Sequence, residues 1–371
     1  MKTSKKKWLY FAFLLFTLGV VVLIGLSGND IPSLIRALRS LSPIYLLYCL
    51  LAWCGYILTD ALTIYYFLKK QEHGISFLQA VYIALVGIYY SNITPTTSGG
   101  QPVQIYRMKQ RGVPIGVGGS ALTVKFFCFQ FMLLVIGAVL WITHAGFVGR
   151  QAEGLTWIVF LGYFFNFLSI GMVLTMAISQ RAMRGIIALC IRVGVRLRIC
   201  KDPEKSAAKW EDHCASFLKS VQMIRSRPKE ILVQFAISSV QLLFLMLVIL
   251  AIYRAFGLSG VSNMELLTMG VLLYISASYT PLPGASGAQE GGFAVFFQGI
   301  FPDASLFVAL MIWRFSTYYL SILVGVVISI YESVRGLSGA RKPNGASKAG
   351  EPEEAKESEE SEATPDSEEN S

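Results

Sequence analysis

The sequence SNITPTTSGGQP at residues 91–102 interrupts a long apolar stretch of the chain. Proline and paired glycines disfavour a continuous helix there, and lipid cannot satisfy the backbone groups that a broken helix exposes. The arm before this break is apolar from residue 77 onward, and the short arm after it ends in Arg107, Lys109 and Arg111. Residues 77–112 are therefore either one complete membrane crossing or a re-entrant hairpin that returns to its side of entry.

The distribution of Lys and Arg distinguishes these two arrangements. A crossing would place the end of this segment outside, together with residues 181–229, which hold twelve Lys and Arg residues. That contradicts the positive-inside rule. If residues 77–112 return to the cytoplasm, 24 of the 30 Lys and Arg residues before position 347 lie inside, and Lys125 and Arg314 lie within spans. The four outside are then Arg36, Arg39, Arg150 and Arg254. We therefore predict a hairpin that enters from the cytoplasm.

A second break of the same kind follows later in the chain, where residues 278–292 read SYTPLPGASGAQEGG. It repeats the Thr-Pro step, the Ser-Gly pair and the Gln that follows them, and it lies within a hairpin predicted at residues 264–302 that enters from the outside. One hairpin opening from each side is typical of inverted-topology repeats. Non-helical backbone at membrane depth is tolerated where it is buried in protein or lines a wet cavity. The two breaks therefore predict a shared central cavity.

Composition and length indicate a membrane protein throughout the apolar part. Hydrophobic residues make up 54% of the 371 positions and charged residues 15%, and a hydrocarbon core about 30 Å thick needs about 20 apolar helical residues. The first apolar run follows three lysines and has no small-residue cleavage site after it, so we expect an uncleaved span rather than a signal peptide. The candidate spans are residues 8–26, 44–68, 114–143, 155–179, 230–253 and 304–332.

We therefore predict an all-α polytopic membrane protein with about six full transmembrane helices and two oppositely oriented re-entrant hairpins. This membrane domain covers residues 1–335, lies in the plasma membrane and has both termini in the cytoplasm. Residues 181–229 alternate basic and apolar positions, which fits either an amphipathic helix on the anionic inner leaflet or a connecting helix packed under the bundle. Residues 338–371 are rich in Glu, Ser and Pro without large apolar residues, which predicts a disordered acidic tail.

The sequence offers no pattern for a metal or a cofactor. Its six cysteines form no C-x-x-C pair, and His213 beside Cys214 has no second pair nearby, so we expect neither a disulfide frame nor a zinc site. No Walker motif is present, which disfavours direct use of ATP. The basic residues flank predicted spans, so topology explains them better than nucleic-acid binding does.

The motifs in the two breaks resemble a known family. They are N-x-T-P, G-G-Q-P and Y-R in the first hairpin and T-P-L-P-G with Q-E-G-G in the second. They resemble the membrane domain of lysylphosphatidylglycerol synthase/flippase (MprF) and its stand-alone relatives, over about residues 8–335. The chain departs from the family at residues 284–288, where a more glycine-rich P-G-G-x-G stretch is usual.

The resemblance implies a domain that moves aminoacylated phosphatidylglycerol between leaflets. In the full-length family a separate soluble domain transfers lysine from charged tRNA to the lipid. About 50 cytoplasmic residues in mid-chain and a short acidic tail are too few for such a fold, which needs on the order of 100 residues. We therefore expect no lysyltransferase activity, although the family name could be attached through the membrane domain alone.

Five charged residues are candidates for binding the head group. Arg314 is about 15 Å into the last span by helical rise and could bind a phosphate or snorkel to the outer interface. Glu290 lies in the second break and could pair with Arg314 or Lys125, take up a proton, or lie solvated at the outer mouth. Lys125 and Asp60 lie within spans, and Arg107 could hold a phosphate at the cavity mouth or serve only the positive-inside bias.

The loop residues are supported as candidates because the break occurs twice, although two purely structural kinks would give the same pattern. The second arm of each hairpin begins near the midplane, so its free N–H groups favour an anion there. The loop candidates are Asn92, Thr94, Pro95, Ser98, Gly99, Gly100, Gln101, Thr280, Pro281, Ser286, Gly287 and Gln289.

These features favour a lipid flippase or transporter for an anionic lipid such as phosphatidylglycerol, lysyl-phosphatidylglycerol or a related lipid phosphate. A phosphatidylglycerol lysyltransferase-type enzyme or its membrane subunit, linked to resistance to cationic antimicrobial peptides, is a second hypothesis, but no nucleophile–base constellation supports it. A transporter of polyprenyl-phosphate or glycan lipids and a non-transporting scaffold are also compatible with the sequence. The expected partners are the bilayer and its anionic lipids, with a separately encoded soluble aminoacyltransferase or glycan-pathway enzyme as a candidate.

Overall fold

The structure is a computed structural model that describes residues 19, 31–94, 97–151, 154, 156–178, 185, 217–222 and 226–334. The predicted first span at residues 8–26, most of the basic segment at 181–229 and the tail at 338–371 lie outside the described residues. The chain divides into two units, Met1–Ile328 and Ser329–Ser371, and every contact discussed below lies within the first.

The described elements are helices, which confirms the all-α prediction for this part of the chain. Five of them are long and apolar enough to cross a bilayer: Pro43–Lys70, Ile115–Thr143, Thr156–Thr175, Pro228–Ala255 and Ser305–Glu332. They match five of the six predicted spans, and the sixth lies outside the described residues. In chain order the helices are α2 (Ile31–Arg39), α3 (Pro43–Lys70), α4 (Phe77–Ile93), α5 (Gly100–Lys109), α6 (Ile115–Thr143), α7 (Ala145–Gln151), α8 (Thr156–Ile178), α11 (Pro228–Ala255), α12 (Asn263–Ala277), η2 (Pro283–Ala285), α13 (Ala288–Phe296), α14 (Asp303–Arg314), the π-helical turn η3 (Phe315–Tyr319) and α15 (Leu320–Val334).

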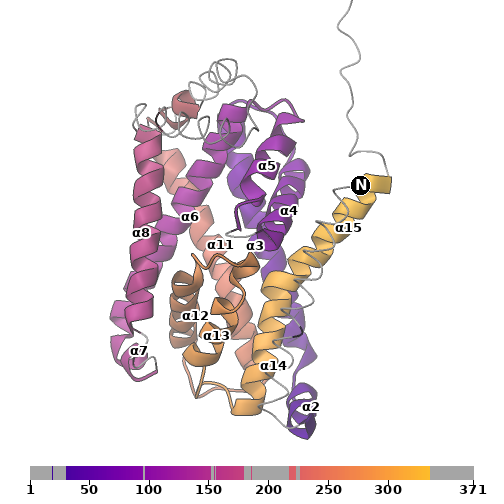
Figure 1. Ribbon diagram of the computed structural model, residues 1–371, viewed down its shortest axis with the longest axis vertical. Coiled ribbons are helices and arrows are strands. Elements are labelled where there is room, and N and C mark those ends of the chain that lie inside the picture. The colour runs from indigo at the N-terminus through magenta and orange to yellow at the C-terminus, as the bar shows by residue number, and fades with distance from the viewer. Residues whose placement is uncertain are drawn as a thin grey trace, which may run out of the picture. The chain divides into compact units, whose positions relative to one another are not determined.

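Both broken segments fold back on themselves. Helix α4 packs against α5, and α12 packs against α13. The side-chain amide of Gln104 on α5 donates a 3.2 Å hydrogen bond to the carbonyl of Ile83 on α4, which links the two arms. In Figure 1, α4 and α5 lie in the upper half of the bundle, near α6. Helices α12 and α13 lie in its lower half, near α8 and α11. Entry into the bilayer from opposite sides stays a prediction.

The two hairpins begin with the same local structure. Ser76 caps α4 in a reciprocal capping box with Gln79, and Ser262 caps α12 in the same way with Glu265. Such a box satisfies two of the N–H groups that the start of a helix leaves unpaired. Each box also precedes its Thr-Pro break by the same number of residues, which supports an internal repeat.

The loops that follow the breaks also correspond. Thr97 in the first loop has φ 54° and Ala285 in the second has φ 51°. Left-handed backbone is uncommon outside glycine and costs on the order of 1–3 kcal/mol per residue. The long helix after each hairpin then begins behind a proline, Pro114 before α6 and Pro302 before α14. These correspondences assign α3–α6 and α11–α15 to the two halves of the predicted repeat.

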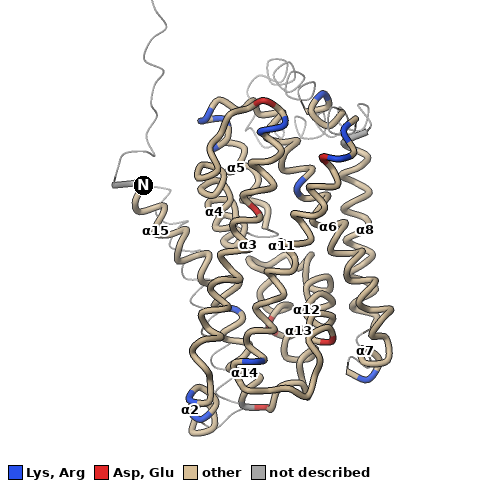
Figure 2. Tube along the Cα trace, turned by 180° about the vertical axis from the view of Figure 1, so that it is seen from behind, with Lys and Arg blue, Asp and Glu red and all other residues tan. Residues whose placement is uncertain are grey.

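Packing and exposure agree with a lipid environment. Helix α11 packs along α3, and the larger apolar core lies around α11, α12, α13 and α14, with Phe293, Phe297 and Phe301 buried in it. Large apolar side chains on α8 face outward, among them Trp157, Phe160, Phe164, Phe167 and Leu168. An exposed apolar face of this kind is expected where lipid takes the place of water. Charged residues lie mostly at the helix ends (Figure 2).

Candidate functional site

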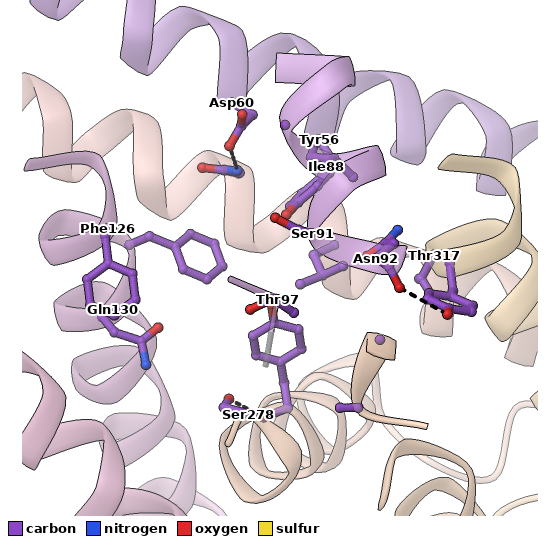
Figure 3. A pocket seen from close by; sticks show the side chains of 18 of the residues that line it. Tyr56, Asp60, Ile88, Ser91, Asn92, Thr97, Phe126, Gln130, Ser278 and Thr317 are labelled. Carbon is purple, nitrogen blue, oxygen red and sulfur yellow. Dashed lines mark hydrogen bonds between the residues drawn. The ribbon is translucent and has the colours of Figure 1, made fainter. Parts of the chain in front are cut away.

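A cavity of about 650 Å³ lies where the two hairpin breaks meet. Asn92, Thr97 and Ser98 line it from the first break, and Thr280 and Gly284 line it from the second. Helices α3, α6, α8 and α11 and the junction of α14 with η3 provide much of the rest of the wall, and the hairpin helices contribute further side chains. Tyrosine and amide side chains of this wall are drawn in Figure 3. The central cavity that the sequence predicts is therefore present.

Arg314, the last residue of α14, lies in the wall of this cavity and is 4% exposed. One terminal nitrogen, Nη2, lies 2.7 Å from Oε1 of Glu290 and donates to Oγ of Ser286 at 3.2 Å. Both terminal nitrogens lie 3.3 Å from the carbonyl oxygen of Gly284. The guanidinium also lies over the ring of Tyr318, 4.5 Å from its centroid. Arg314 thus ties the second loop to the last span.

Glu290 supports this arginine from the first turn of α13. Its Oε2 accepts the backbone N–H of Gly287 at 2.6 Å while Oε1 faces Arg314. The carboxylate therefore occupies the anion-binding start of α13, the place where the sequence predicts an anion. Glu290 is 8% exposed and is not among the described residues that line the cavity.

Tyr318 fixes how closely the two loops approach each other. Its hydroxyl donates a 3.1 Å hydrogen bond to the carbonyl of Asn92 in the first break. Its ring passes so close to Gly284 that a Cβ added there would lie 2.0 Å from it, and Gly284 has φ 59°. The backbone at 284 therefore favours glycine, and the close approach of the tyrosine requires it.

A second buried ion pair lies in the wall of the same cavity. Nζ of Lys125 on α6 lies 2.6 Å from Oδ2 of Asp60 on α3, and Gln241 on α11 donates to Oδ1 at 2.9 Å. Asp60 is 3% exposed, and the side chain of Lys125 is 19% exposed. Lys125 and Asp60 both line the cavity.

Comparison with known proteins agrees with this architecture. The family described as the lysylphosphatidylglycerol synthase TM region matches residues 9–325. The chain belongs to this family. It is also similar to a UPF0104 membrane protein from Archaeoglobus fulgidus, with 23% identity over 266 residues that cover 71% of this chain and 79% of the relative. It is thus a multi-pass membrane protein of the lysylphosphatidylglycerol synthase TM family.

Within this family member, the predicted site residues divide into three groups. The cavity wall contains Arg314, Lys125, Asp60, Asn92, Ser98, Gln101, Thr280 and Gln289. Behind the wall, Ser286 binds Arg314 and Gly287 binds Glu290. In the first loop, the hydroxyl of Thr94 accepts the N–H of Gly99 at 2.9 Å. This bond closes the loop immediately before Gly100 begins α5. Pro281 is exposed and is not among the described residues of the wall, and Pro95 lies outside the described residues.

Arg107 lies on α5, and it is not among the described residues of the wall. Its guanidinium lies 5.7 Å from the ring centroid of Tyr82 and donates to Gln110 at 3.2 Å. A contact between Arg107 and phosphate stays a prediction for the mouth of the site.

Neutral polar residues on the long helices in and beside the wall were not predicted, because a single amide or hydroxyl in an apolar run is a weaker signal than a charge. Gln130 on α6 bonds to Asn166 on α8 and to the hydroxyl of Tyr279, and that hydroxyl donates to Ser169. Gln130 and Asn166 are buried at membrane depth in otherwise apolar helices. A buried amide in lipid is costly without a partner, so a lone Gln or Asn in a long apolar run was the signal that could have revealed them.

Proposed function

We propose that this protein moves an anionic lipid, such as phosphatidylglycerol, lysyl-phosphatidylglycerol or a related lipid phosphate, between the two leaflets. The observation that carries this proposal is Arg314, a buried arginine in the wall of a polar cavity at the junction of two broken helices. Its Nε has no hydrogen-bond partner among the described residues. A buried donor without a partner costs about 1–3 kcal/mol, and more when charged.

A phosphate meets the needs of this arginine. Arginine keeps its charge at physiological pH, and its planar group binds phosphate through two parallel hydrogen bonds. Glu290 now provides the single carboxylate contact, so it acts as an internal anion that a lipid phosphate would replace. Gly287 would still bind Glu290 after the exchange, which reduces the cost of separating the pair.

The size of the cavity fits a head group rather than a whole lipid. Small-molecule sites commonly enclose about 300–1,000 Å³, and the cavity of about 650 Å³ lies in that range. Two acyl chains would remain in the surrounding lipid, where the exposed apolar faces of the helices lie. The site therefore suits a carrier that handles the polar part of a lipid at the midplane.

The proposed mechanism uses the repeat. With six spans and two hairpins that enter from opposite sides, each half of the protein could close one access route while the other opens, as in transporters built from inverted repeats. The π-helical turn directly after Arg314 is a place where a helix can adjust without breaking, and such turns often lie at functional sites.

Proteoliposomes test this function. Phosphatidylglycerol with a fluorescent tail is placed in both leaflets, and dithionite added outside bleaches the outer one. We expect bleaching to pass about half when the protein is present, and faster movement for phosphatidylglycerol than for zwitterionic phosphatidylcholine. Bleaching that stops at half, as in protein-free vesicles, would contradict the proposal. A polyprenyl phosphate shares the phosphate group, so competition by its short-chain form distinguishes that substrate class.

A further inference from the structure

The two buried cations occupy corresponding places in the repeat. Lys125 comes eleven residues after Pro114, which precedes α6, and Arg314 comes twelve residues after Pro302, which precedes α14. At 1.5 Å per residue each cation is about 15–18 Å along its helix. Helix α6 begins beside α5 and α14 packs against α13, so the two helices start from opposite ends of the bundle (Figure 1).

Each cation also has the same kind of support. Lys125 and Arg314 each pair with one carboxylate, at 2.6 Å and 2.7 Å. Each carboxylate accepts a second hydrogen bond from the protein, Asp60 from Gln241 and Glu290 from the N–H of Gly287. A carboxylate held in this way keeps one hydrogen-bond donor when its cation leaves to bind another anion.

We propose that Lys125 is a second phosphate-binding position in the same cavity, released by Asp60, and that the lipid head group passes between Lys125 and Arg314. This inference rests on the function proposed above. The ligand of this second position is a lipid phosphate, either a diester or a monoester. Lysine is a compact point charge on a flexible stem, whereas arginine offers a planar fork, so Lys125 is the weaker and more mobile of the two positions.

A purely structural ion pair is the competing explanation for Asp60 and Lys125. Buried pairs of this kind are often no more stabilising than neutral residues of similar size, and removing one partner alone is harmful because it leaves a buried charge. The partial exposure of Lys125 toward the cavity, against the near-complete burial of Asp60, favours a lysine that exchanges its partner.

The test measures equilibrium binding of dihexanoyl phosphatidylglycerol to purified protein, with dihexanoyl phosphatidylcholine as the comparison lipid. The background is Arg314→Ala, in which binding is weak but measurable. Adding Asp60→Asn should strengthen the remaining binding about three- to tenfold, because Lys125 loses its competitor. Adding Lys125→Gln should reduce it to the level of phosphatidylcholine. Remaining binding that neither substitution changes would overturn the inference.

Lipid movement by otherwise wild-type variants provides the second arm. Lys125→Gln should stop movement, and the double variant Asp60→Asn/Lys125→Gln should stay inactive although it buries no unpaired charge. Recovery of movement in the double variant would mean that the pair is only structural. Failure of the wild-type protein to bind or move phosphatidylglycerol would instead reject the proposed function. Arg150→Ala, an exposed arginine on α7, is the matched control and should behave as wild type.

Discussion

The hydroxyl of Tyr318 donates a 3.1 Å hydrogen bond to the main-chain carbonyl of Asn92, and this bond joins the last span of the second repeat to the break of the first. Tyr318 is 2% exposed, and the guanidinium of Arg314 lies over its ring. One tyrosine therefore connects both loops to the proposed phosphate site. A movement of one loop would therefore displace the other loop through Tyr318.

Tyr318→Phe should separate the two roles of this side chain. The ring and its contact with Arg314 remain, while the bond to Asn92 is lost, which costs about 0.5–1.5 kcal/mol for a typical net hydrogen bond. We expect a slightly lower unfolding temperature, nearly unchanged binding of phosphatidylglycerol and slower lipid movement. Thermal unfolding, binding and dithionite assays measure the three quantities. Unchanged movement would show that the bond does not couple the loops.

Gly284→Ala should be strongly destabilising. A Cβ at this position meets the ring of Tyr318 at 2.0 Å, and the left-handed backbone adds about 1–2 kcal/mol. Gly257→Ala is the matched control, because Gly257 has φ 70° and open space around its Cβ position. We expect a clearly lower unfolding temperature for Gly284→Ala than for Gly257→Ala. Equal losses in the two variants would contradict the close approach of Tyr318.

The predicted topology places both termini and the basic segment at residues 181–229 in the cytoplasm. Lys205→Cys, in a background without reactive native cysteines, should react with an impermeant maleimide only after the membrane is opened. Arg150→Cys should react from the outside in intact cells or spheroplasts. Labelling of position 205 from outside would exclude six spans with two oppositely oriented hairpins.

Much of the arrangement could be predicted from the sequence because its signals are local. The Thr-Pro steps and glycines locate both breaks, and the length of the apolar runs locates the spans. Arg314 and Glu290 could be proposed as partners because charge is rare at membrane depth. Their pairing at 2.7 Å agrees with that hypothesis.

The remaining parts of the site depend on how distant helices pack. Lys125 could not be assigned to Asp60 from the sequence, because 65 positions separate them and only the contact of α3 with α6 brings them together. The same holds for Tyr318, whose partner Asn92 lies in the other repeat. Arg107 was proposed from its place beside a hairpin, but the rotation of α5 about its axis decides which side chains reach the wall.

Variants of Arg314 and Glu290 test whether Arg314 binds a lipid phosphate. Arg314→Ala removes the charged donors, so binding of phosphatidylglycerol should weaken about 10- to 100-fold, as for loss of charge-assisted hydrogen bonds. Arg314→Lys should recover only part of the binding, because a point charge lacks the planar fork. Glu290→Gln should affect binding less than turnover. Binding should be kept or strengthened because the competing internal anion is removed, whereas movement should slow because no carboxylate then displaces the lipid phosphate from Arg314.

The most direct measurement is the rate of phosphatidylglycerol movement in proteoliposomes that contain equal amounts of folded wild-type or Arg314→Ala protein, with Arg150→Ala as the control. We predict that Arg314→Ala abolishes movement, that Arg314→Lys restores a fraction of it and that Arg150→Ala retains the wild-type rate. A wild-type rate in Arg314→Ala would contradict the account, because the head group would then cross without the one buried arginine that lines the described cavity.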